Sequence, residues 1–328
     1  MVEGVDRSRG VAYGPAVHRT KTRFAARINH VASSVEKRGV RATYRLHDRV
    51  LSNRSSRRHF TGSAPELDDV QQRIVSELAV DGYCVIPFSE LIPEPATWSA
   101  IEESTGTFVA ETEASLAGDR EALRVRAGKE FVVRLLSYGV DLGLDDPWFA
   151  TCASHRMLDI ANTYLGLWSK LEYVDMWYSV PQPADADRIA SQRWHRDFND
   201  KHLLKAFLYL VDVDEGTGPF EYVPGSAPGG RYGDAWPWRP LGENYPPDGE
   251  LEKRIPDDGI RTFTAPKGTM VFCNTSGFHR GGFATERPRV LATVTYSSPA
   301  SLASLTERSY RFRGSLDALD PATRFALS

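Results

Sequence analysis

The sequence predicts a mainly β fold with flanking helices, in which short antiparallel strands form a sandwich or a barrel. From about residue 171 onward, short β-rich runs are separated by Gly and Pro, a pattern typical of antiparallel sandwiches and barrels. Before residue 171, helical apolar spacing alternates with short strand candidates. The 328 residues are 41% hydrophobic and 25% charged, which is ordinary for a globular protein of one large or two modest domains.

Residues 1–62 are predicted to form a basic, helical N-terminal extension. Residues 1–60 contain 14 Lys and Arg against 4 Asp and Glu, while the remainder of the chain is acidic. We favour helices that lie on the acidic surface of the same protein, with an anionic partner or a transit peptide as alternatives. The segment matches no nucleic-acid-binding motif, so no nucleic-acid partner is expected.

Residues 63–328 are predicted to form the main domain, which begins with a helix that leads into a strand. In ELDDVQQRIVSELAVDGYCVIPF, apolar side chains recur at helical spacing, and Asp81-Gly82 then turns the chain into a short apolar run. A strand candidate, KEFVVRLLSYG, and a helix candidate, SHRMLDIANTYLGLWSK, follow. The next predicted strands lie in LEYVDMWYSV, LLKAFLYLVDV, GPFEYVPGS, GIRTFTAPKGTMVFC and RVLATVTYSS.

An insert at about residues 229–259 interrupts these strands and is rich in Pro, Gly and Trp. Long irregular loops in compact domains are usually functional or disordered, and exposed tryptophans favour a lid. Trp236, Trp238 and Arg239 are therefore predicted to contact a substrate.

No apolar run approaches the roughly 20 residues that span a bilayer, and the N-terminus lacks the apolar core of a secretory signal. We therefore expect a cytoplasmic protein with no membrane partner. The three cysteines are scattered and are predicted to be buried thiols.

His195 and Asp197 lie two residues apart in SQRWHRDFND. Residues two apart in an extended chain share one face, so this pair is either a salt-linked couple, two unrelated surface groups, or part of a metal site. A second histidine, His279, follows an apolar run in a late predicted strand. Two histidines and one carboxylate form the facial triad that binds non-haem Fe(II) and leaves adjacent positions open.

In this order, WHRD, FLYLVDVDEGTGPFEYVPGS, GTMVFCNTSGFHRGG and RPRV resemble the phytanoyl-CoA dioxygenase family of Fe(II)- and 2-oxoglutarate-dependent oxygenases. The resemblance covers about residues 171–298, and DGYCVIPF resembles the family's N-terminal helix-to-strand entry. It implies a double-stranded β-helix, a jelly-roll or cupin-like barrel, with His195, Asp197 and His279 as iron ligands. The implied cofactors are Fe(II), 2-oxoglutarate as co-substrate, and O2. The implied reaction oxidises, most directly hydroxylates, a C–H bond of a small molecule and releases succinate and CO2, as in natural-product biosynthesis.

The family places an arginine shortly after the distal histidine to bind the far carboxylate of 2-oxoglutarate. Arg287 and Arg289 are the candidates, and the resemblance favours Arg289, the second arginine of Arg-Pro-Arg, whose planar fork suits a carboxylate. Both are expected to point the same way if the strand is regular. Lys205 alternates with aromatic residues and is expected either to contact 2-oxoglutarate inside the barrel or to extend to solvent at a strand end. Gln192 is a further candidate contact for 2-oxoglutarate.

Asp175 and Trp177 share one strand face and are predicted to contact the substrate; a pairing of Asp175 with an arginine is the alternative. Two other functions stay open. One is a metal-dependent cupin-type enzyme that does not use 2-oxoglutarate, and the other is a ligand-binding barrel without catalysis. Desaturation, epimerisation and cyclisation begin with the same hydrogen abstraction as hydroxylation and stay open beside it, as does the oligomeric state.

Overall fold

A computed structural model describes residues 34–118, 125–126, 129–134, 140–240, 244–302 and 309–328. The strands of its largest sheet are, in chain order, β1 (Tyr83–Pro87), β2 (Val125–Arg126), β3 (Lys129–Arg134), β5 (Lys170–Ser179), β6 (Leu203–Tyr209), β9 (Thr269–Cys273) and β11 (Arg289–Ser297). These seven strands are arranged in the order β1-β9-β6-β11-β5-β3-β2, and all their pairings are antiparallel.

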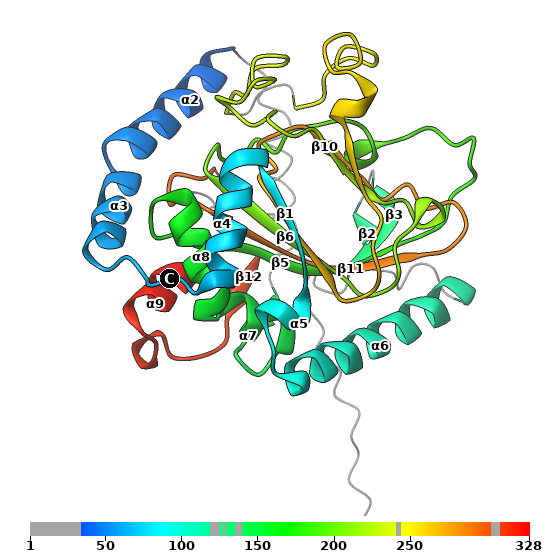
Figure 1. Cartoon of the computed structure of the whole chain (residues 1–328), viewed down its shortest axis with the longest axis horizontal. Coiled ribbons are helices and arrows are strands. Elements are labelled where there is room, and N and C mark those ends of the chain that lie inside the picture. Colours follow the sequence, from blue (N-terminus) through cyan, green and yellow to red (C-terminus); the bar gives the residue numbers. More distant parts are fainter. Residues whose placement is uncertain (1–33, 119–124, 127–128, 135–139, 241–243, 303–308) are drawn as a thin grey trace, which may run out of the picture.

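A second, three-stranded antiparallel sheet consists of β7 (Phe220–Tyr222), β8 (Arg261–Phe263) and β10 (His279–Arg280), in the order β10-β7-β8. A parallel pair joins β4 (Val140–Leu142) to β12 (Tyr310–Phe312). Figure 1 shows the sheets at the centre of the molecule with helices around them. The expected antiparallel β architecture with flanking helices is therefore present.

The α-helices of the described residues are α2 (Ser34–Arg49), α3 (Ser52–Gly62), α4 (Asp69–Asp81), α5 (Phe88–Leu91), α6 (Pro95–Ala117), α7 (Pro147–Ala153), α8 (His155–Leu165) and α9 (Pro321–Leu327). Short 3₁₀ turns occupy Ala190–Gln192, Glu215–Thr217, Asp257–Gly259 and Leu316–Ala318. None of the described helices is both long and apolar enough to cross a membrane.

The predicted helix-to-strand entry is confirmed by α4 and β1. The Asp68 carboxylate accepts a hydrogen bond from the backbone N–H of Gln71, whose side chain in turn accepts from the Asp68 N–H, so two free helix-end donors are satisfied. The helix ends at Gly82, whose φ of 79° is left-handed. Glycine adopts this conformation without strain, and β1 begins at the next residue.

The helix α6 is a feature that the sequence pattern did not predict. It starts with Pro95 in its first turn, where a missing N–H costs nothing. Its buried positions are Ile101, Thr105, Phe108 and Thr112. Because two of these four are threonines, the apolar periodicity that marks a surface helix is weak.

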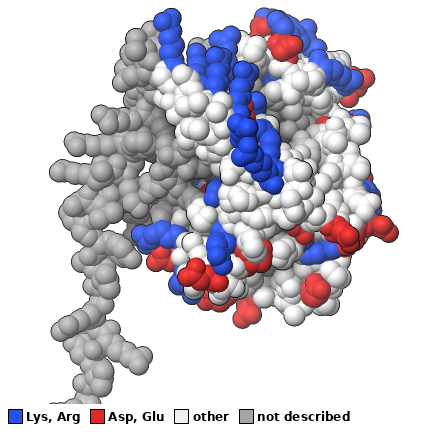
Figure 2. Space-filling model, turned by 90° about the vertical axis from the view of Figure 1, so that its left-hand side faces the viewer, with Lys and Arg blue, Asp and Glu red and all other residues white. Residues whose placement is uncertain are grey.

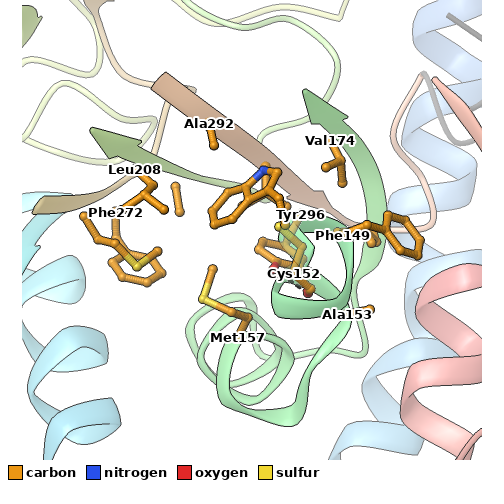
Figure 3. Close-up of a cluster of buried hydrophobic side chains, with 14 of the residues drawn as sticks. Phe149, Cys152, Ala153, Met157, Val174, Leu208, Phe272, Ala292 and Tyr296 are labelled. Carbon is orange, nitrogen blue, oxygen red and sulfur yellow. Dashed lines mark hydrogen bonds between the residues drawn. The ribbon is translucent and has the colours of Figure 1, made fainter. Parts of the chain in front are cut away.

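The two faces of β6 pack into different clusters. Ala206, Leu208 and Leu210 belong to the large cluster between the main sheet and the helices. Figure 3 shows Met157, from α8, facing the sheet that carries Leu208 and Ala292, with Phe149, from α7, at the other end of the cluster near Val174. Full burial of a leucine stabilises a fold by about 1.5–3 kcal/mol.

The opposite face of β6 turns toward the smaller sheet. Phe207 and Tyr209 pack with Phe220 of β7 and Phe263 of β8 in a second apolar cluster. Since Lys205 has the same parity as Phe207 and Tyr209, its side chain starts on this inner face. The space between the two sheets therefore has apolar walls and a polar end at Lys205.

Within residues 229–240 and 244–259, the insert contains turns and one 3₁₀ turn, and neither α-helix nor strand. The expectation that its tryptophans are exposed is wrong: Trp236 and Trp238 are half-buried, because they pack against apolar clusters that include Leu251 and Tyr44, respectively.

The helices α2 and α3 lie along one side of the molecule (Figure 1). Figure 2 shows Lys and Arg side chains gathered on this side, and Arg38, Arg45 and Arg49 of α2 are exposed. Residues 1–33 lie outside the described residues, and the boundary of the extension at residue 62 stays a prediction. The three cysteines are buried as predicted.

Candidate metal centre

Three side chains that are far apart in the sequence converge at one end of the inter-sheet space. One ligand atom from each of His195, Asp197 and His279 lies within 4.8 Å of the others. His195 and His279 are joined by two main-chain hydrogen bonds of 3.0 Å, and the N–H of Asp197 donates to the carbonyl of Thr275 at 2.9 Å. The backbone itself therefore fixes the spacing of the three ligand candidates.

Both imidazoles are held in the orientation that a metal ligand needs. The Nδ1 atom of His195 lies 2.9 Å from the carbonyl oxygen of Arg193, and Nδ1 of His279 lies 3.0 Å from that of Gly277. A carbonyl oxygen only accepts hydrogen bonds, so each Nδ1 carries the proton and each Nε2 presents a lone pair. Such backbone contacts commonly orient metal-bound histidines.

Burial keeps both imidazoles neutral. It lowers the pKa of His195 well below its ordinary value and that of His279 to about 4. Burial alone would raise the pKa of Asp197, but the positive charge of Lys205 and the hydrogen bond from it lower that pKa below its usual range. At neutral pH the site therefore consists of two neutral nitrogens and one carboxylate, the ionisation states that bind a metal.

The low pKa of His279 predicts how the stability of the metal-free protein depends on pH. An unfolded histidine titrates near pH 6.5, so between pH 6.5 and 4 the unfolded chain binds more protons than the folded one. His279 alone should therefore lower the free energy of unfolding by about 1 kcal/mol between pH 7.5 and 5.5. Urea denaturation at both pH values measures this loss, and the variant His279→Asn should lose less. Equal losses in the two proteins would show that His279 titrates normally.

The donor set fits ferrous iron. Two imidazole nitrogens and one carboxylate oxygen are the ligands of the facial triad of non-haem Fe(II) proteins. Among the described residues, this is the one group of three or more His, Cys, Asp or Glu side chains close enough to hold a metal ion.

Arg289 provides a buried cation beside this site. Its side chain is 4% exposed, and its Nη1 donates to the carbonyl of Gly218 at 2.7 Å. Its Nε has no hydrogen-bond partner among the described residues. A buried guanidinium with unused donors suits a carboxylate, which it can bind with two parallel hydrogen bonds. Binding of the far carboxylate of 2-oxoglutarate by Arg289 stays a prediction.

Two glycines bring the guanidinium close to the metal ligands. A Cβ atom at Gly282 would lie 3.0 Å from Nη2 of Arg289, and the φ of Gly282 is 85°. Gly281 and Gly282 follow His279 within three residues, so the absence of side chains lets Arg289 pack against the chain that carries this histidine.

Arg287 points elsewhere. It is 56% exposed and forms an ion pair with Asp214. The two arginines were expected to face the same way only if the strand is regular. That condition is not met, because β11 begins only at Arg289 and residues 285–287 form a bend.

Lys205 and Gln192 both lie near the site, in different roles. The Nζ atom of Lys205 lies 2.6 Å from Oδ2 of Asp197, so its charge lies beside the carboxylate of the triad and not at a solvent-exposed strand end. The Gln192 amide is fully buried; its Nε2 donates to the Gly282 carbonyl at 3.3 Å, and its Oε1 accepts from the Ile189 N–H at 3.0 Å. Gln192 therefore supports the glycine turn against which Arg289 packs.

Asp175 has the arginine partner that the sequence offered as the alternative. It is fully buried, pairs with Arg134 of β3, and accepts a hydrogen bond of 2.6 Å from the hydroxyl of Tyr173. Trp177 donates to the same hydroxyl at 3.0 Å and is half-buried. Substrate contact by Asp175 or Trp177 stays a prediction.

The insert reaches the metal centre through two aromatic residues. The indole Nε1 of Trp238 donates to the backbone carbonyl of Asp197 at 2.8 Å. The ring of Tyr245 stacks on His195 with centroids 5.4 Å apart. Trp236 packs in an apolar cluster on the insert, and Arg239 is exposed.

Arg196, which separates two of the ligand candidates, holds the loops behind the site, and the sequence analysis missed it. Its buried guanidinium donates to the carbonyls of Ser226, Gly233 and Ser276 at 2.6–2.8 Å. The alternation of an extended chain was the available signal: if His195 and Asp197 face the metal, the residue between them points into the loops behind it.

No protein-family model and no curated protein matches the sequence. Among solved structures, the chain is similar to EctD from S. alaskensis with 2-oxoglutarate and 5-hydroxyectoine, with a TM-score of 0.51 and 19% identity over 75% of this chain and 84% of that chain. The two proteins share a fold. A further match is the non-haem α-ketoglutarate-dependent epimerase SnoN from nogalamycin biosynthesis, with a TM-score of 0.45 and 19% identity over 70% of this chain and 81% of that one. Other matching structures hold Fe, and one contains both Fe3+ and α-ketoglutarate.

Proposed function

We propose that this protein is an Fe(II)- and 2-oxoglutarate-dependent oxygenase that oxidises a C–H bond of a small molecule and releases succinate and CO2. The observation that carries the proposal is the buried convergence of His195, Asp197 and His279, with ligand atoms within 4.8 Å of one another. The guanidinium of Arg289 is buried, and its Nε has no partner among the described residues; this supports 2-oxoglutarate as the co-substrate.

Each residue has a distinct task in this proposal. His195, Asp197 and His279 would hold the iron, and Arg289 would bind the far carboxylate of 2-oxoglutarate. Lys205 supplies positive charge beside the carboxylates that gather at the metal. When bound, iron and 2-oxoglutarate activate O2 for oxidation of the substrate, while the apolar walls between the sheets exclude water from the reaction.

The finer assignment is to the phytanoyl-CoA dioxygenase family, with hydroxylation as the reaction and the two antiparallel sheets as the halves of a double-stranded β-helix. The sequence motifs that surround the triad support it, as does the fold shared with EctD. The half-buried Trp177 and the exposed Arg239 of the insert are proposed to contact the substrate, a small molecule such as an intermediate of natural-product biosynthesis.

Anaerobic spectroscopy followed by product analysis tests the proposal. Addition of Fe(II) and 2-oxoglutarate should give the weak visible charge-transfer band of the chelate, and admission of O2 with candidate metabolites should release succinate. Iron binding without a band from 2-oxoglutarate would instead indicate a cupin-type metalloenzyme of another kind. A protein that binds no iron would be a ligand-binding barrel.

A further inference from the structure

The helix α2, from the basic N-terminal segment, contacts the loop that directly follows Asp197. The hydroxyl of Tyr44 donates to Oδ1 of Asp200 at 2.7 Å and accepts from the N–H of Lys201 at 3.3 Å. Tyr44 is 2% exposed and Asp200 is fully buried. The other carboxylate oxygen of Asp200 accepts from the N–H of Ser298, at the end of β11, so the loop is fixed between α2 and the main sheet.

A second contact lies one helical turn further along α2. Asp48 is 3% exposed, and its carboxylate lies 2.6 Å from Nζ of Lys201 and 3.1 Å from Nε2 of His202. Residues four apart on a helix share a face, so Tyr44 and Asp48 together contact three successive residues of the loop.

The same tyrosine also reaches the metal ligand by another route. Its ring lies 5.4 Å from that of Trp238, and the indole of Trp238 donates to the backbone carbonyl of Asp197. The side chain of Arg41, also on α2, donates to the carbonyl of Pro240 at 3.3 Å. The helix thus holds both the insert that carries Trp238 and the loop after Asp197.

We propose that α2 is a positioning element of the metal centre, in which Tyr44 acts through Trp238 and through Asp200 to hold the Asp197 carboxylate toward the two imidazoles. This inference rests on the proposed function. It assigns the N-terminal segment a role within the site, where the sequence favoured a surface extension and left an anionic partner or a transit peptide as alternatives. The exposed arginines of α2 take no part in these contacts.

The physical reason is that Asp197 has two parts in this arrangement. Its carboxylate would be the ligand, and its main chain is the part that these contacts hold. The Asp197 main chain is fixed at its N–H by Thr275 and at its carbonyl by Trp238, so a shift of either contact rotates the carboxylate relative to the imidazoles. Loss of partners that orient metal ligands typically weakens metal binding by about 10- to 100-fold.

Titration of the metal-free protein with Fe(II) alone, under anaerobic conditions in a calorimeter, tests the proposal. Trp238→Phe removes the indole N–H and keeps an aromatic ring, and Tyr44→Phe removes the hydroxyl and keeps the ring. Each should weaken Fe(II) binding by about tenfold or more. Arg45→Ala, on the exposed face of α2, is the matched control and should bind Fe(II) as the wild type does.

The double variant with both Phe substitutions gives a further readout. If Tyr44 and Trp238 act on Asp197 as one unit, the combined loss of affinity should be smaller than the product of the two single losses. Melting temperatures of the metal-free variants separate positioning from general stability, because a purely structural role lowers the melting temperature and leaves the Fe(II) affinity of the folded protein unchanged.

The outcomes are distinct. If the wild type binds Fe(II) and the Trp238→Phe and Tyr44→Phe variants bind it equally well, this inference is overturned and the proposed function is left intact. Wild type that binds no Fe(II) overturns both. Should Tyr44→Phe fail to fold, because the Asp200 carboxylate loses a buried donor, Trp238→Phe alone decides.

Discussion

The variant Asp197→Ala is expected to lose Fe(II) binding and, with it, all consumption of 2-oxoglutarate. The side chain is the single anionic ligand of the triad, and its removal leaves two neutral imidazoles beside the positive charge of Lys205. Electrostatic repulsion between this ammonium group and a divalent cation would then be unopposed. We expect Fe(II) affinity to fall by more than about 100-fold, the upper end of the losses seen when only partners of the ligands are removed.

Anaerobic Fe(II) titration and a succinate assay measure this effect. Asp145→Ala is the matched control, because Asp145 is an exposed carboxylate that also pairs with a basic residue, Arg313, and it should behave as wild type. A folded Asp197→Ala protein that consumes 2-oxoglutarate at the wild-type rate would refute the metal centre proposed here.

The variant Arg289→Leu is expected to lose affinity for 2-oxoglutarate while it keeps its affinity for Fe(II). Removal of one partner of a buried, hydrogen-bonded charge pair costs about 2–5 kcal/mol, so the KM for 2-oxoglutarate should rise by about 30-fold or more. Arg289→Lys should also be impaired, because an ammonium group cannot reproduce the two parallel hydrogen bonds of a guanidinium.

Arg287→Leu is the control within the same sequence motif. Arg287 is more than half exposed and pairs with Asp214, so its loss should leave both affinities unchanged. If instead Arg287→Leu raised the KM for 2-oxoglutarate and Arg289→Leu did not, the assignment of the two arginines would have to be exchanged.

Those features of the site that depend on the alternation of side chains along a strand could be predicted from the sequence. His195 and Asp197 are two residues apart and were expected to share one face, and one ligand atom of each lies within 4.8 Å of the other. Side chains in strands alternate with a period of two whatever their surroundings, so local spacing carries this information.

Features that depend on contacts between distant segments could not be predicted in this way. Tyr44 is one aromatic residue in a basic helix, and nothing near it in the sequence indicates the buried Asp200 to which it donates, 156 residues away. Trp238 was assigned to the surface of a lid, yet its indole faces the chain of the metal ligand. The helix α6 was missed because threonines occupy half of its buried positions.

The paired main chains of His195 and His279 have a consequence for how the site is filled. Their reciprocal hydrogen bonds form when the sheets form during folding. The conformational entropy of bringing the two imidazoles together is therefore lost during folding and not when the metal binds. Small zinc domains, in contrast, fold only when the ion arrives. In this protein an added cation should raise the melting temperature by mass action alone. A chelator should strip the cation without unfolding the chain, so that different divalent ions can be exchanged into one intact scaffold.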